Sequence, residues 1–301
     1  MRVSVHRSAL QWLRPPTHSL AQYLHTKAHS TLLVLSSTVN KVTTLTMNHP
    51  AKCNNWSVPM LDMLYHKMAL CAKDDNTKVI ILTGADPYYS SGGDISGYMK
   101  LQHPEKFHSM IVENNYKMFN TFISFPKPIL IAANGPAIGG AVTSAALCDG
   151  ILASERATFL TPFSRMCVPP EGCSSATFAR IMGEDAANKM LKDCQTVCAA
   201  EAKDIGLVME VVEHDKLMQA AQAVAEEWVV KHKTRKMIGG GSKEEYSELN
   251  AKESVAVADA FLSYQFLNAQ FSFLWGKGKL SNAFIFWILK TLRPLWIKVL
   301  K

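Results

Sequence analysis

Short apolar segments alternate with amphipathic segments through the middle of this chain, and this alternation limits its fold more than any other feature. Residues 79–82 and 129–133 have the length and composition of buried strands. Between them, residues 105–124 carry apolar side chains at helical spacing and end before two prolines. Because strand, helix and strand follow each other in this order, the sequence predicts an α/β fold with short crossover connections.

Further elements extend this pattern on both sides. Upstream, two strands are expected around a turn at Asn40 and Lys41, and Ser57 should cap a helix with one apolar face. Downstream, a helix of small residues should start near Gly139, followed by short strands at 150–153 and 158–160. After Val212 the pattern is helical. We therefore divide the chain into an arm (1–30), a core (31–230), a helical region (231–280) and a tail (281–301).

The net charge of +7 is confined to the two ends of the chain. Residues 1–30 hold four Lys/Arg and residues 277–301 hold six, and neither segment contains an acidic residue. The part between them holds 22 basic and 25 acidic residues. This distribution argues against a core that binds nucleic acid, because such a core would itself be basic.

Seven cysteines are scattered along the chain without a CxxC pair. No spacing of Cys and His indicates zinc ligands, so we predict no metal site. An odd number of unpaired cysteines is typical of reduced thiols in an intracellular compartment.

Residues 1–30 contain Arg, Ser and His, and the first acidic residue of the whole chain is Asp62. This composition is typical of a mitochondrial transit peptide. A disordered basic arm is the alternative.

The tail, residues 281–301, interleaves aromatic and aliphatic residues with four basic ones. Its longest uninterrupted apolar run, 283–289, has seven residues, whereas about 20 are needed to span a bilayer. We therefore expect a helix that makes peripheral contact with a membrane or packs on a neighbouring subunit. Pro294 should kink or break this helix.

Two glycine-rich turns precede a loop that contains a single carboxylate. The turns are YSSGGD at 89–94 and NGPAIGG at 134–140, and the loop TPFSRMCVPPEGCSS at 161–175 has Glu171 as its only acid. A lone base can remove a proton next to a carbonyl while two backbone N–H groups hold the resulting oxyanion. The residues alone also allow purely structural roles. The glycines also suit plain turns or close helix packing, and Glu171 also suits a surface position before a helix capped by serine.

In these three segments the chain resembles the enoyl-CoA hydratase/isomerase (crotonase) superfamily, over about residues 31–212. It is most similar to the Δ3,Δ2-enoyl-CoA isomerase branch of peroxisomes and mitochondria. The resemblance implies a spiral of ββα units with a C-terminal helical region that covers the acyl pocket and builds a trimer or hexamer. It also implies an acyl-CoA thioester substrate, no separate cofactor because CoA is part of that substrate, and a mitochondrial location with a peroxisomal one as the alternative.

The resemblance also implies roles for particular residues. Glu171 would be the acid/base, and the N–H groups of Gly93 and Gly140 would form the oxyanion hole. The segment 47–54 matches the loop that contacts CoA, and the CoA-binding residues would be Lys52, Asn54, Ser91 and Gly92. For Lys52, a solvated loop lysine is the alternative.

Two departures from the family pattern favour isomerisation over hydration. Typical hydratases carry two catalytic glutamates, and the matching positions here are Thr143 and Phe163. Hydration uses one carboxylate to activate water and a second to deliver a proton, whereas isomerisation needs one base. A hydratase remains an alternative, and so does a non-catalytic module of the chromodomain-Y type, which binds CoA or protein and has Asp where this chain has Glu171.

Overall fold

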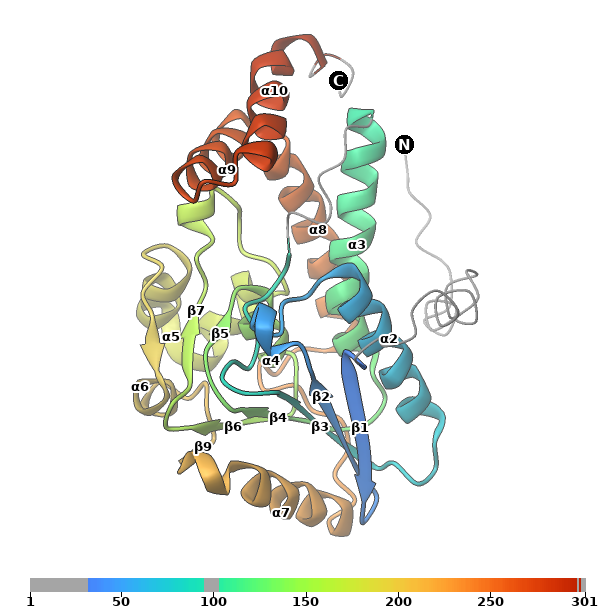
Figure 1. The fold of residues 1–301 in the computed structure, drawn as a ribbon. Coiled ribbons are helices and arrows are strands. Elements are labelled where there is room, and N and C mark those ends of the chain that lie inside the picture. Colours follow the sequence, from blue (N-terminus) through green and yellow to red (C-terminus); the bar gives the residue numbers. More distant parts are fainter. Residues whose placement is uncertain (1–31, 95–102, 297, 299–301) are drawn as a thin grey trace.

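The computed structural model describes residues 32–94, 103–296 and 298 (Figure 1), so the predicted basic arm lies outside the described residues. A six-stranded sheet has the order β1-β2-β3-β4-β6-β9. The first two strands are antiparallel, and all the other neighbours are parallel. The strands are β1 (Val34–Val39), β2 (Val42–Met47), β3 (Val79–Gly84), β4 (Ile129–Ala133), β6 (Gly150–Ser154) and β9 (Glu210–Val212).

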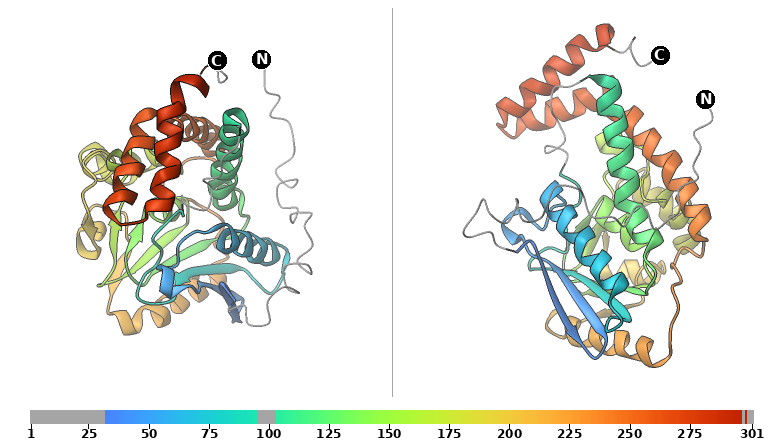
Figure 2. Two further views of the ribbon diagram at one scale, coloured as in Figure 1. Left: turned by 45° about the horizontal axis from the view of Figure 1, so that its top comes forward. Right: turned by 90° about the vertical axis from the view of Figure 1, so that its right-hand side faces the viewer.

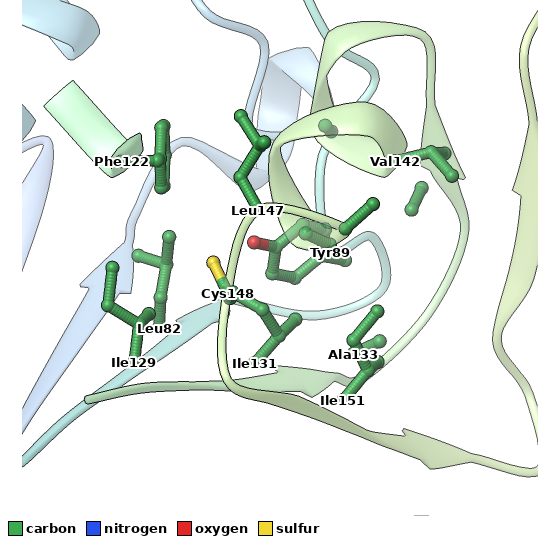
Figure 3. Close-up of a cluster of buried hydrophobic side chains, with 14 of the residues drawn as sticks. Leu82, Tyr89, Phe122, Ile129, Ile131, Ala133, Val142, Leu147, Cys148 and Ile151 are labelled. Carbon is green, nitrogen blue, oxygen red and sulfur yellow. The ribbon is translucent and has the colours of Figure 1, made fainter. Parts of the chain in front are cut away.

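Both faces of this sheet are covered, which explains the nearly continuous apolar sequence of its central strands. On one face, Ile81 and Leu130 pack against Trp228 of α7 (Leu217–Val230), which lies below the sheet in Figure 1. On the other face, Ile80 and Leu82 belong to the main core with α2 (Val58–Lys73). Figure 3 shows this side, with the side chains of neighbouring strands pointing toward Tyr89 and Leu147.

A smaller sheet lies beside the first and positions the glycine turns. Its strand order is β5-β7-β8. The short helices α4 and α6 and the long helix α5 connect these strands to the rest of the chain. These elements are β5 (Ala137–Ile138), β7 (Thr158–Leu160), β8 (Val197–Cys198), α4 (Gly140–Ala145), α5 (Ser174–Leu191) and α6 (Ala199–Asp204). Short 3-10 helices among the described residues cover Pro50–Lys52, Ser164–Met166 and His214–Lys216.

The C-terminal helices lie at the end of the molecule opposite α7 (Figures 1 and 2). α3 (Pro104–Ser124) packs along α8 (Lys243–Phe261), while α9 (Tyr264–Gly276) and α10 (Leu280–Trp296) pair as a helical hairpin. Of the kink or break predicted at Pro294, the break does not occur, because α10 continues through this residue for two more positions. In the described part of the chain, no helix is long and apolar enough to cross a bilayer.

Most of the predicted elements are confirmed with small shifts of their ends. Ser57 caps α2 by accepting a hydrogen bond from the Met60 N–H, and Asn40 and Lys41 turn the chain with positive φ angles. The first strand, which the apolar pattern predicts to start at Leu32, starts at Val34. The apolar faces predicted for α2 and α3 are buried, with Leu61, Leu64, Met68 and Cys71 on the first and Phe107, Ile111, Met118 and Phe122 on the second.

Candidate active site

The two glycine-rich turns are hydrogen-bonded to each other. The Ser90 N–H donates to Pro136 O at 3.2 Å, and the Ile138 N–H donates to Ser90 O at 3.0 Å. Between them, Gly92 has a φ of +76°, and a Cβ there would lie 2.3 Å from Ile138 O. Only glycine fits such a contact, because any side chain would force the turns apart.

This pairing brings the N–H groups of Gly93 and Gly140 to one pocket, which both residues line. Within the described residues, neither N–H donates to a protein acceptor. A Cβ on Gly92 would lie 3.6 Å from Gly140 N, which shows how closely the turns approach. Two residues that line one pocket, with N–H groups that have no acceptor in the described part of the chain, can together bind a single oxygen with negative charge.

Glu171 lies in the same pocket, next to Gly140. A Cβ on Gly140 would be 3.4 Å from Glu171 Oε1. Glu171 is the only carboxylate among the described residues that line this pocket, whose walls are largely apolar. Removal from water raises the pKa of Glu171 to about 7, against its ordinary value of 4.5. Because Glu171 lines this pocket and only part of its surface is exposed, the alternative of a carboxylate on the outer surface is wrong.

Asn115 on α3 orients the Glu171 carboxylate. Its Nδ2 donates to Glu171 Oε2 at 2.5 Å, and this bond lowers the pKa of Glu171 against the effect of desolvation. The other amide atom, Oδ1, accepts from Ser254 Oγ of α8 at 3.0 Å. The amide is thus fixed with its donor toward the carboxylate.

Glu253 on α8 holds the backbone on the other side of Glu171. Its carboxylate accepts from the Cys173 N–H at 2.6 Å and from the Ser175 hydroxyl at 2.6 Å and N–H at 3.3 Å. It therefore takes the capping role expected of a serine at the start of α5. Its own pKa is raised by burial, and its charge raises the pKa of Glu171.

Sequence reasoning missed both Asn115 and Glu253, although a signal was present. Asn115 follows Phe107 and Ile111 at helical spacing, so it occupies an inward-facing position of its helix. Glu253 lies on the buried face of α8 with Val257. A polar residue on an apolar helix face needs a partner, which makes it a candidate for a supporting role.

Comparison with known proteins identifies the family. The model of the family described as enoyl-CoA hydratase/isomerase matches residues 37–270. The chain belongs to the enoyl-CoA hydratase/isomerase family. The fold agrees, since a solved enoyl-CoA hydratase/isomerase from Pseudoalteromonas atlantica T6c superimposes with a TM-score of 0.69 at 25% identity, over 80% of this chain and 96% of that one.

Several of the relatives are named as isomerases. Enoyl-CoA delta isomerase 2 of Rattus norvegicus is 32% identical over 84% of this chain and 66% of its own length. Enoyl-CoA delta isomerase 3, peroxisomal, of Mus musculus is 32% identical over 84% of this chain and 81% of its own length. The chain thus spans slightly less than two thirds of the rat protein. Chromodomain Y-like protein 2 of Mus musculus is 32% identical over 70% of this chain and 44% of its own length.

The four residues predicted to bind CoA differ in their surroundings. Ser91 lines the pocket, and Lys52 is exposed on a 3-10 helix outside it. Asn54 is fully buried. Its Oδ1 accepts a hydrogen bond from the His49 N–H, and its Nδ2 donates to Ala85 O and Tyr88 O. A side chain used in this way cannot reach a ligand, so that prediction is wrong and Asn54 instead supports the loops.

Gly92 also needs correction as a CoA-binding residue. It is buried, its N–H donates to Ser90 Oγ at 3.1 Å, and its carbonyl accepts from the Trp56 N–H at 2.8 Å. Since both backbone groups are occupied, its role is to let the two turns meet.

The positions that carry glutamates in typical hydratases of this family lie close to Glu171 but provide no acid. Thr143 is buried on α4, and its hydroxyl would be 2.6 Å from a Cβ placed on Gly172. Phe163 lines the pocket. The site can therefore offer one carboxylate and two N–H donors to a bound thioester.

Proposed function

We propose that this protein is a Δ3,Δ2-enoyl-CoA isomerase that converts 3-enoyl-CoA to trans-2-enoyl-CoA in the β-oxidation of unsaturated fatty acids. The observation that carries the proposal is the pairing of a single desolvated carboxylate, Glu171, with the free N–H groups of Gly93 and Gly140. The similarity to proteins named as enoyl-CoA delta isomerases supports it.

In the proposed mechanism, the thioester oxygen lies between the N–H groups of Gly93 and Gly140. Glu171 removes a proton from the α carbon, and the electrons of that C–H bond delocalise into the thioester as a dienolate. The protonated Glu171 then returns the proton to the γ carbon, which leaves the double bond conjugated with the carbonyl. A pKa of about 7 suits this exchange, because both forms of the carboxyl are accessible near neutral pH. The mechanism draws on no separate cofactor, since CoA is part of the substrate.

The test is the rate of conjugation of 3-hexenoyl-CoA, followed by the absorbance of the enoyl thioester. Glu171→Gln should lower turnover about 10²–10⁴-fold or more. The matched control is Glu248→Gln, which neutralises an exposed carboxylate of α8 and should leave turnover unchanged. More than a tenth of wild-type turnover in Glu171→Gln would refute the role of Glu171.

The same preparation separates the alternatives. Hydration of crotonyl-CoA should be negligible, because Thr143 and Phe163 provide no second carboxylate. Fast hydration would favour a hydratase. Binding of acyl-CoA without isomerisation or hydration would favour a non-catalytic module such as the chromodomain-Y proteins carry.

We further propose an organellar location and a trimeric or hexameric assembly. One relative is named as peroxisomal, whereas the composition of residues 1–30 favours mitochondria. A fluorescent protein fused to residues 1–30 should enter mitochondria, and a cytosolic or peroxisomal signal would contradict this. Light scattering of the full chain tests the assembly, and a monomer would refute it.

A further inference from the structure

A hollow lined by basic side chains lies at the amino ends of the central strands, away from the candidate active site. Its volume is about 380 Å³, within the range of small-molecule sites, which is about 300–1,000 Å³. None of the described residues that line it is acidic. We call it the basic hollow, and its basic residues are Lys41, Lys78, Lys127, His232, Lys233 and Arg235.

The sheet brings three of these lysines to one edge. Lys41 and Lys78 directly precede β2 and β3, and Lys127 lies two residues before β4. Because β2, β3 and β4 are parallel neighbours, their amino ends meet at the same edge of the sheet. The Lys78 N–H donates to Lys41 O at 2.8 Å, so the backbone at these two lysines is held together.

The segment after α7 forms the other wall of the basic hollow. Lys233 Nζ lies 3.2 Å from the centroid of the Trp228 ring, and Trp228 also lines the hollow. Arg235 forms an ion pair with the buried Asp149 and donates to Phe122 O at 2.8 Å. The charge of Arg235 is therefore compensated within the protein, and its contacts fix the loop that carries Lys233.

The four lysines form no ion pair with a carboxylate in the part of the chain that the structure describes. Lys127 Nζ donates to Cys71 O at 2.6 Å and to Asp74 O at 2.7 Å, which leaves one of its three donors free. Burial lowers the pKa of Lys127 and the charge of Lys78 lowers it further, whereas Asp74 and Asp75 oppose this effect. A bound anion would offset the repulsion between these lysines.

We propose that the basic hollow is a binding site for a small polyanion with a di- or triphosphate group. Four lysines without carboxylate partners suit several negative charges, and lysine binds phosphate as a point charge. The hollow lies on the side of α7, at the other end of the molecule from α9 and α10 (Figures 1 and 2). It therefore does not use the helical hairpin near the expected subunit contacts.

This site is separate from the chemistry at Glu171. The pocket with Glu171 is lined by Trp56, Gly93 and Gly140, which follow the carboxyl ends of β2, β3 and β4. The basic hollow lies at the amino ends of the same strands. Failure of the polyanion proposal would thus leave the isomerase proposal untouched.

The experiment is isothermal titration calorimetry of the full chain with inorganic triphosphate at low salt. One triphosphate should bind per chain, and salt should weaken the binding by screening the lysines. ATP should compete for the site, and adenosine should not bind. Tighter binding of ATP than of triphosphate would identify a nucleotide as the ligand, and equal affinities would show that the phosphates alone are recognised; either result supports the site.

Lys41→Glu with Lys78→Glu should weaken triphosphate binding at least tenfold. Even in bulk water, one pair of charges about 4 Å apart changes a binding constant roughly fivefold. The matched control is Lys192→Glu with Lys203→Glu, the same charge change at exposed lysines that do not line the hollow, and it should bind like the wild type. Both variants should stay folded by circular dichroism and turn over 3-hexenoyl-CoA at the wild-type rate.

Three results would overturn the proposal. The first is absence of triphosphate binding by the wild type at low salt. The second is wild-type affinity in the variant with Lys41→Glu and Lys78→Glu. The third is an equal loss of affinity in the control, because binding would then depend on the net charge of the protein and not on the hollow.

Discussion

Replacing Asn115 by leucine should move the pH dependence of isomerisation to higher pH. The Asn115 amide donates to Glu171 Oε2 at 2.5 Å and so stabilises the ionised carboxylate. Leucine has a similar branched shape, cannot donate, and keeps water from the vacated position. The ionised form of Glu171, which acts as the base, therefore becomes less stable, and its pKa must rise.

The size of the shift follows from the strength of the lost bond. A hydrogen bond to a charged group contributes about 1.5–3 kcal/mol, which corresponds to about 1–2 pKa units at 1.36 kcal/mol per unit. The pKa of Glu171 should rise from about 7 to a value between about 8 and 9. At pH 7 the ionised fraction would then fall from about one half to between about one tenth and one hundredth, and kcat/KM would fall about 5–50-fold.

The assay is kcat/KM for 3-hexenoyl-CoA measured across pH, since this ratio reports ionisation in the free enzyme. Activity of Asn115→Leu should recover at high pH. The control is Asn114→Leu, the same change at a neighbouring pocket residue that, within the described structure, makes no hydrogen bond to Glu171, and its inflection should stay near 7. A uniform loss for Asn115→Leu with an unmoved inflection would refute the assigned role of Asn115.

Three further outcomes are expected. Glu171→Gln should stabilise the fold at pH 8 by about 3 kcal/mol, at 1.36 kcal/mol per pKa unit, with no gain at pH 4. The reason is that a folded pKa of about 7 against an ordinary 4.5 makes the native state lose stability as pH rises through that window. Denaturant titrations at both pH values check this. Gly92→Ala should destabilise the protein by more than about 2 kcal/mol. Gly93→Ala should melt like the wild type in thermal scans, because no atom of the described residues lies within 4 Å of the added Cβ. Glu253→Gln should lower turnover about tenfold or more, as expected when a supporting contact is lost. It should also move the inflection of the pH profile to lower pH, opposite to Asn115→Leu, because a negative charge that raises the pKa of Glu171 is removed. An unmoved inflection would contradict the coupling between Glu253 and Glu171.

The sheet and its covering helices could be predicted because the signals for them are local. Apolar runs such as Ile129–Ala133 are buried on both faces, and the Ser57 cap marks a helix start within a few residues. The approach of the glycine turns was implied only through family resemblance. Their direct contact depends on the pairing of Ser90 with Ala137, which no local pattern reports.

Residues with polar side chains proved harder to interpret than apolar ones. Asn54 and Lys52 are two positions apart in the loop expected to contact CoA, yet one is buried in loop-to-loop hydrogen bonds and the other is exposed. Sequence alone cannot separate these cases, since an amide side chain can form hydrogen bonds with a ligand or with backbone groups equally well. The choice depends on which carbonyls the fold brings near, here those of Ala85 and Tyr88.

The same reasoning explains why the base and its supports come from distant parts of the chain. Glu171 must be desolvated to reach a pKa near 7, but an unsupported carboxylate in an apolar pocket would take a proton too readily to act as a base. The hydrogen bond from Asn115 on α3 lowers the pKa of Glu171 against the effect of desolvation. The charge of Glu253 on α8 raises this pKa, while its carboxylate also fixes the backbone of the loop. Since α3 and α8 pack together, a change in their packing alters both effects at once. The helical region after residue 230 therefore contributes to the acid–base balance of the site as well as to its walls.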